Sequence, residues 1–188
     1  PIFTFINKMD REGRDPLDLM EEIEKLLGIH CVPVNWPLGT GANFQGVYDR
    51  RLKKCFLFKH SEHKGVRVEH EEIDWDEERL RGLLGDSVYE ETAETLELLD
   101  EAGEEFDWER FHTGDITPVF FGSALTNYGV MPFLRAFGEL APEPVPRHST
   151  EGIIKPDEQK FSGFIFKIQA NMDKNHRDRI AFLRIVSG

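Results

Sequence analysis

A short apolar run opens the chain, and a helical pattern follows it. Residues 1–6 contain a single polar side chain, which is typical of a strand buried on both faces, as in a parallel sheet. After a polar loop, Asp15 and Pro16 are residue types preferred at a helix N-terminus, and apolar positions recur at helical spacing until Gly28. This order of strand, loop and helix predicts the first half of a βαβ unit.

The second half of that unit comes much later in the chain. Residues 116–121 form another apolar run, followed by a polar loop and a second helical pattern. A βαβ crossover takes roughly 30 residues, whereas 116 positions separate Asn7 from Ser123. We therefore expect residues 29–115 to be an inserted α+β subdomain, in which short strands precede two acidic helices between about residues 76 and 106.

The pattern changes again near the C-terminus. Residues 143–159 begin with a proline-rich stretch and are expected to form a linker between domains. Two apolar runs within residues 160–188 are joined by polar residues, which is typical of an antiparallel hairpin that opens a β-barrel or a sandwich. Because the chain starts and stops inside apolar elements, we expect it to be a piece of a longer protein.

Composition excludes several classes of protein. Hydrophobic residues make up 39% of the 188 residues, which excludes disorder of the whole chain. No run approaches the ~18 apolar residues of a membrane span, so no membrane partner is expected. The formal net charge of −12 argues against a protein whose entire surface binds nucleic acid.

Cysteines and histidines offer little support for a disulfide framework or a metal site. Two cysteines, Cys31 and Cys55, cannot build either a set of disulfides or a four-ligand zinc site, and they favour a reduced, cytoplasmic location. Both lie in strand-like stretches, where we expect inert packing residues. His60, His63 and His70 do not have a trustworthy ligand spacing, so we predict no metal site.

The candidate chemistry lies in the two polar loops that follow the apolar strands. Ligands of open α/β sheets bind beyond the carboxyl ends of the strands. In the first loop, Asn7 can tie neighbouring loops together, the stem of Lys8 can lie across a flat base, and the Asp10 carboxylate can accept two hydrogen bonds from guanine. In the second, Ser123 can fix the loop, while the small Ala124 lets a backbone N–H approach the base carbonyl. A solvated turn would explain either loop alone, but both together favour a guanine site.

These loops, with the large insertion and the late strands, resemble the translational GTPases. The resemblance covers the whole chain and is most distinct in residues 5–16, 171–173 and 176–184. It implies the C-terminal part of a P-loop GTPase domain, followed by the start of an antiparallel β-barrel domain. Residues 1–28 and 116–142 would be the guanine-recognition part. The residues implied to hold the base of GTP or GDP are Asn7, Lys8, Asp10, Ser123, Ala124 and Leu125.

The catalytic half of the family's site has no counterpart in this sequence. The chain contains no Gly-x-x-x-x-Gly-Lys-Ser/Thr phosphate loop, and no switch loops that would seat magnesium and the γ-phosphate. We therefore expect no catalytic residue here, no GTP hydrolysis by this chain alone, and Mg²⁺ only in the full-length protein.

The resemblance is closest to the branch of the family that acts in translation termination. It implies a GTPase that binds the ribosome, including ribosomal RNA, and drives class I release factors off it, with GTP hydrolysis resetting the cycle. A ribosomal GTPase that acts in elongation is one alternative. A nucleotide-independent interaction module is the other.

Charge is distributed unevenly along the chain. Residues 71–109 contain 17 acidic and 2 basic side chains, and residues 160–188 contain six basic and two acidic ones. Five glutamates recur at helical spacing and form one stripe: Glu90, Glu94, Glu97, Glu101 and Glu105. The stripe is either a solvated face or a docking face for a basic partner, which the resemblance suggests is the ribosomal stalk protein. The basic end is either ordinary hairpin charge or a contact with RNA phosphates.

Overall fold

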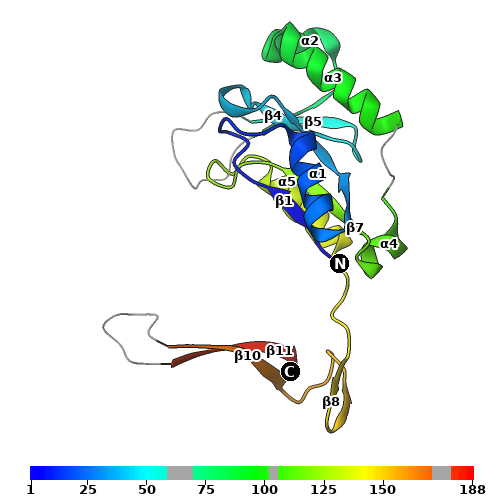
Figure 1. Cartoon of the computed structure of the whole chain (residues 1–188), viewed down its shortest axis with the longest axis vertical. Coiled ribbons are helices and arrows are strands. Elements are labelled where there is room, and N and C mark those ends of the chain that lie inside the picture. The colour runs from blue at the N-terminus through cyan, green and yellow to red at the C-terminus, as the bar shows by residue number, and fades with distance from the viewer. Residues whose placement is uncertain (59–69, 102–105, 171–178) are drawn as a thin grey trace. The chain divides into compact units, whose positions relative to one another are not determined.

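The computed structural model describes residues 1–58, 70–101, 106–170 and 179–188. The chain divides into two compact units, Pro1–Ala141 and Pro142–Gly188. Figure 1 shows its helices and strands in chain order from blue to red.

The first unit contains a three-stranded parallel sheet. Its strands are β1 (Thr4–Ile6), β7 (Ile116–Phe121) and β2 (His30–Pro33), in the order β1-β7-β2. The two apolar runs expected to be neighbours are therefore adjacent and parallel, with Ile6 opposite Phe121. Because β2 pairs with β7 in this sheet, our expectation that all of residues 29–115 lie outside it is wrong at its start.

Two helices cover opposite faces of the parallel sheet. Helix α1 (Pro16–Leu27) packs Met20 into the cluster that contains Phe121, whereas α5 (Val130–Leu140) packs Ala136 into the cluster that contains Phe120. The predicted signals at α1 are confirmed. The Asp15 side chain accepts a hydrogen bond from the Leu17 amide, and Gly28 ends the helix in the left-handed conformation.

An antiparallel sheet follows β2, and its strands run in chain order. The strands are β3 (Asn35–Leu38), β4 (Gly46–Asp49), β5 (Lys54–Phe58) and β6 (His70–Asp74), with a short helical turn η1 (Gly41–Asn43) after β3. We call these four strands and η1 together the antiparallel sheet. Its order needs only hairpin connections between neighbouring strands.

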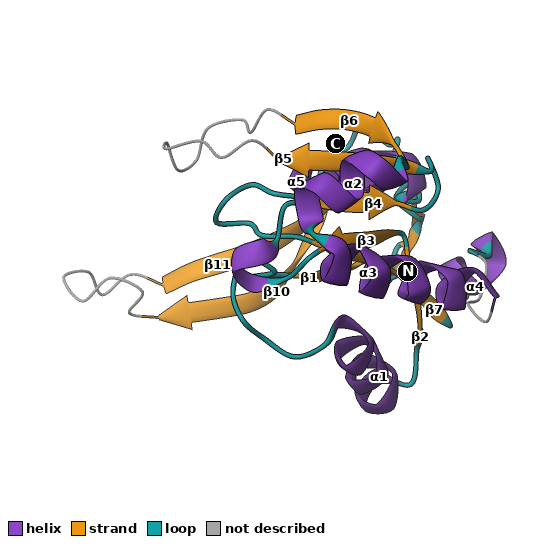
Figure 2. Cartoon of the chain, turned by 90° about the horizontal axis from the view of Figure 1, so that it is seen from above, coloured by secondary structure: helices purple, strands orange, loops and turns teal. Residues whose placement is uncertain are grey.

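The two expected acidic helices lie over the antiparallel sheet (Figure 2). They are α2 (Glu77–Leu84) and α3 (Asp86–Glu101). Leu80 of α2 and Leu96 of α3 join the same apolar cluster as Phe56 of β5, so the helices bury one face of the sheet. A short helix, α4 (Trp108–Thr113), then leads into β7.

Both cysteines are buried, as expected of packing residues. Burial, with a smaller contribution from Glu24, raises the pKa of the Cys31 thiol to about 11. Burial and Asp74 raise the pKa of the Cys55 thiol to about 12. Neither thiol therefore carries an appreciable thiolate fraction near neutral pH, which makes both poor nucleophiles.

The second unit consists of two hairpins. One pairs β8 (Arg147–Ser149) with β9 (Gly152–Ile154), and the other pairs β10 (Ser162–Ala170) with β11 (Arg179–Ser187). Residues 143–159, which we expected to be a plain linker, thus contain a hairpin of their own. The polar residues 171–178, with His176 and Arg177, lie outside the described residues. In the part of the chain that the structure describes, no helix is long and apolar enough to span a membrane.

Candidate functional site

The loop after β1 makes a tight turn that presents polar side chains. The Arg11 amide donates to the carbonyl of Lys8 across 3.0 Å, which closes the turn, and Lys8 adopts a φ of +71°. A residue with a Cβ pays roughly 1–2 kcal/mol for this conformation, so tertiary contacts must hold the turn in place. One such contact is the buried Met9, whose amide donates to the carbonyl of Gly122 in the second loop across 3.1 Å.

Asn7 links the two loops through its side chain. Its Oδ1 atom accepts a hydrogen bond from the Ala124 amide at 2.9 Å and another from the Lys8 amide at 2.8 Å. Residues separated by 117 positions are thereby brought together at the carboxyl ends of β1 and β7. The Ala124 amide, which we expected to approach a base carbonyl, is already held by Asn7.

Asp10 contains the least satisfied polar atom of the site. Its Oδ1 atom is shielded from solvent and has no hydrogen-bond partner among the described residues. A buried acceptor without a donor costs about 1–3 kcal/mol, so such an atom in a native protein usually has a role. A carboxylate of this kind fits a ligand that brings N–H donors, and the N1–H and exocyclic amine of guanine form a donor pair of that type.

Ser123 and Leu125 occupy contrasting environments. Ser123 is fully buried, and its backbone exchanges two hydrogen bonds with Tyr128, at 2.8 Å and 2.9 Å. It therefore fixes the second loop from inside. Leu125 is 51% exposed, and Lys8 and Ala124 are also exposed. These three side chains lie open to a ligand at the sheet edge, whereas Ser123 does not.

One polar residue that was not predicted from the sequence supports the site. Asn35, at the start of β3, is fully buried. Its Oδ1 accepts from the Phe121 amide at 2.7 Å, and its Nδ2 donates to the Phe121 carbonyl at 3.2 Å. The side chain thus pairs with the last residue of β7 as a strand would, directly before the second loop. The available signal was a polar residue between apolar Val34 and Trp36.

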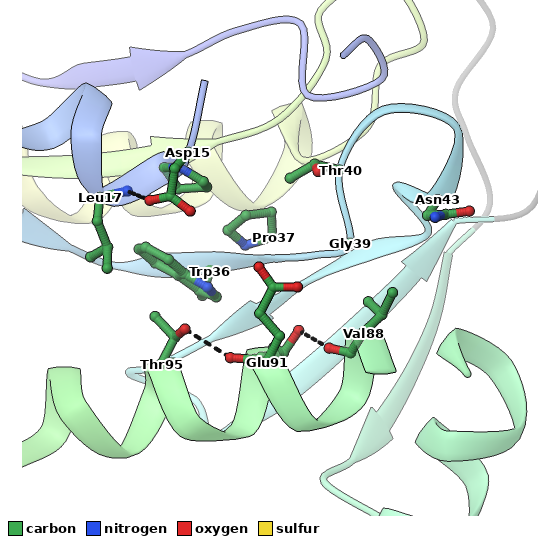
Figure 3. A pocket seen from close by; sticks show the side chains of 12 residues that line it. Asp15, Leu17, Trp36, Pro37, Gly39, Thr40, Asn43, Val88, Glu91 and Thr95 are labelled. Carbon is green, nitrogen blue, oxygen red and sulfur yellow. Dashed lines mark hydrogen bonds between the residues drawn. The ribbon is translucent and has the colours of Figure 1, made fainter. Parts of the chain in front are cut away.

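A separate pocket lies next to the loop that follows β3. It has a volume of about 180 Å³ and is lined by α1, α3 and this loop. Figure 3 shows Asp15, Thr40 and Glu91 around it. None of the residues expected to hold the base lines this pocket. Among the described residues, no group of three histidine, cysteine or acidic side chains could hold a metal ion, and His60 and His63 lie outside them.

Replacing Asn7 by Ala should separate the two loops. We expect the affinity of the full-length gene product for GDP to fall by roughly tenfold, because two backbone amides lose their acceptor. Equilibrium titration with a fluorescent GDP analogue measures the effect. Gln159→Ala, which removes an exposed amide side chain from the second unit, is the matched control and should bind GDP normally. Unchanged binding by Asn7→Ala would show that the link between the loops is dispensable.

Comparison with known proteins identifies the family to which the chain belongs. Residues 1–143 match the family of the elongation factor Tu GTP-binding domain, and the chain belongs to this family of translational GTPases. Over all 188 residues it is 50% identical to peptide chain release factor 3 of Symbiobacterium thermophilum, of which it covers 36%. Across its whole length it is 53% identical to peptide chain release factor 3 of Macrococcus caseolyticus, again covering 36%. The expected resemblance to the termination branch is confirmed.

A solved structure has a similar fold. A crystal structure of a protein from Thermus thermophilus matches all of this chain with a TM-score of 0.59 and 25% identity. The chain covers 27% of that protein. It thus spans about a third of the length of the curated relatives, and about a quarter of this structural one.

Proposed function

We propose that this chain is the guanine-recognition part of a translation termination factor that binds GTP and GDP. The observation that carries the proposal is the shielded, unpartnered Oδ1 of Asp10, beside loops that Asn7 links at the ends of two parallel strands. In this proposal Asp10 accepts from the paired N–H groups of guanine, and the stem of Lys8 lies against the base. The residues proposed to hold the nucleotide are Asn7, Lys8, Asp10, Ala124 and Leu125, with the buried Ser123 fixing the second loop from inside.

The chemistry of hydrolysis is not assigned to any residue of this chain. The sequence holds no phosphate loop, so the β- and γ-phosphates and Mg²⁺ would be bound by other parts of the full-length protein. The contribution proposed for this chain is selection and orientation of the base. Bound GTP supplies the phosphoanhydride bond whose hydrolysis would reset the factor.

The proposed action is removal of class I release factors from the ribosome, in the cytoplasm. Its support is similarity along the whole chain to proteins named peptide chain release factor 3. The test uses termination complexes that carry a fluorescent class I release factor. The full-length gene product with GTP should accelerate dissociation of the label. Acceleration of translocation instead would favour a factor that acts in elongation, and no effect of GTP in either assay would contradict a ribosomal GTPase.

The acidic face of α3 is proposed to help recruit the protein to ribosomes. Glu94, Glu97 and Glu101 are exposed and make no ion pair with any described residue. Glu90 differs, because the Arg81 guanidinium donates a hydrogen bond to it at 2.9 Å. This hydrogen bond raises the pKa of the Arg81 guanidinium. Glu105 lies outside the described residues. The docking charge would then come from the three unpaired glutamates, with the ribosomal stalk protein as the proposed partner.

Changing these three glutamates to glutamine should slow association of the full-length gene product with ribosomes. We expect the largest effect at low salt, where charge is least screened, and roughly a tenfold loss of association rate there. Stopped-flow mixing at several salt concentrations measures it. The control changes three scattered exposed glutamates, Glu78, Glu109 and Glu143, and so removes the same net charge. Equal rates for the two triple variants would show that position on α3 is irrelevant.

A further inference from the structure

The antiparallel sheet contacts the loop that follows β1, which we call the first guanine loop, through Gly41 of η1. The Gly41 amide donates to the carbonyl of Met9 across 2.8 Å. Gly41 has a φ of +61°, and a Cβ there would come within 3.4 Å of the Glu12 side chain and 3.5 Å of its backbone. Glycine is therefore favoured both by its conformation and by the close approach to the loop.

The antiparallel sheet contacts the loop that follows β7, which we call the second guanine loop, through aromatic rings. Phe58, at the end of β5, stacks on Tyr128 with ring centroids 4.6 Å apart and planes inclined by 23°. Phe44 lies 6.0 Å from Phe58 and 6.2 Å from Tyr128, also by ring centroids. The backbone of Tyr128 holds Ser123 by two hydrogen bonds, so the stacked rings brace the loop that carries Ala124.

We propose that the antiparallel sheet is a positioning element of the guanine site. The sheet contacts both loops. These contacts set the rate of nucleotide release and the preference of Asp10 for the guanine base. The physical reason is that two short loops at strand ends would lose conformational freedom on binding, and bracing them beforehand lowers that cost. This inference rests on the proposed binding of guanine nucleotides.

A purely structural role would have a different signature. If the contacts at Gly41 and Phe58 served only to bury apolar surface, weakening them would lower stability and leave nucleotide binding unchanged. The chain offers matched controls for both contacts. Leu96 is buried in the same apolar cluster but lies on α3, and Gly28 has a φ of +66° with no atom within 4 Å of the Cβ position.

The first test follows release of a fluorescent GDP analogue from the full-length gene product. Phe58→Leu removes the stacked ring and should speed release by roughly 3–10-fold, the range expected for loss of an aromatic pair. Phe58→Tyr keeps the ring and should release GDP at the unsubstituted rate. Leu96→Ala should lower the melting temperature without changing release. An unchanged rate in Phe58→Leu would overturn the inference, as would an equal acceleration in Leu96→Ala.

The second test measures how well the base is read. IDP lacks the exocyclic amine of GDP, so the ratio of the two affinities reports on the position of Asp10. Gly41→Ala should reduce this ratio by about threefold or more, because the Met9–Asp10 turn shifts, whereas Gly28→Ala should leave it unchanged. An unchanged ratio in Gly41→Ala, with normal GDP binding by the unsubstituted protein, would overturn this inference alone. If the unsubstituted protein bound no GDP, the proposed function would fall and the inference with it.

Discussion

An Asp10→Asn substitution is expected to turn the guanine site into a xanthine site. The carboxylate would make two charge-assisted hydrogen bonds to guanine, each contributing roughly 1.5–3 kcal/mol. The mutant amide places an N–H donor opposite the exocyclic amine of guanine, so we expect GDP affinity to fall by roughly 10²-fold or more. Xanthine carries a carbonyl at that position and can accept from the amide, so XDP affinity should rise.

Competition between GDP and XDP for the full-length gene product measures this exchange. Asp18→Asn, which neutralises an exposed aspartate on α1, is the matched control and should retain the preference for GDP. The melting temperature of Asp10→Asn should stay close to that of the unsubstituted protein, because the shielded Oδ1 has no partner to lose. If Asp10→Asn still preferred GDP to XDP, Asp10 would not read the base.

An Asn35→Leu substitution is expected to destabilise the first unit strongly. Leucine has the same branched arrangement of side-chain heavy atoms but cannot pair with the amide and carbonyl of Phe121, which Asn35 holds at 2.7 Å and 3.2 Å. Two backbone groups would be left without partners in a fully buried position. We expect the free energy of unfolding to fall by about 2–5 kcal/mol.

Urea unfolding followed by tryptophan fluorescence is a suitable measurement, since Trp36 packs against Phe121 with ring centroids 5.1 Å apart. Thr92→Val is the matched control. It also removes a buried polar group, but among the described residues its hydroxyl bonds only to the Val88 carbonyl within α3, so the expected loss is about 1 kcal/mol. Similar losses in both variants would mean that Asn35 does not act as a strand-like partner of β7.

The elements beside the candidate site could be predicted because their signals are local. Apolar runs mark β1 and β7, and Asp15, Pro16 and Gly28 mark the ends of α1 within a few residues of the helix. The polar loops then follow directly from where the strands end. For the same reason, the close approach of Asn7 to Ala124 could be expected from the parallel pairing of two strands.

Other features depend on contacts that no local pattern encodes. Strand β2 pairs with residues more than 80 positions away along the chain. A short apolar sequence pattern does not show whether the strand joins a parallel or an antiparallel sheet. Asn35 was missed because its role exists only through Phe121, on a different strand. Glu90 belonged to the predicted stripe, but it forms an ion pair with Arg81 of the preceding helix.

Equilibrium competition between GDP and ADP is the most direct test of whether this chain selects guanine. The full-length gene product should prefer GDP by roughly 10⁴-fold or more, because adenine offers no donor pair to Asp10 and would leave buried polar groups unpaired. Comparable affinities for GDP and ADP, or binding of neither, would contradict selection of guanine by this chain.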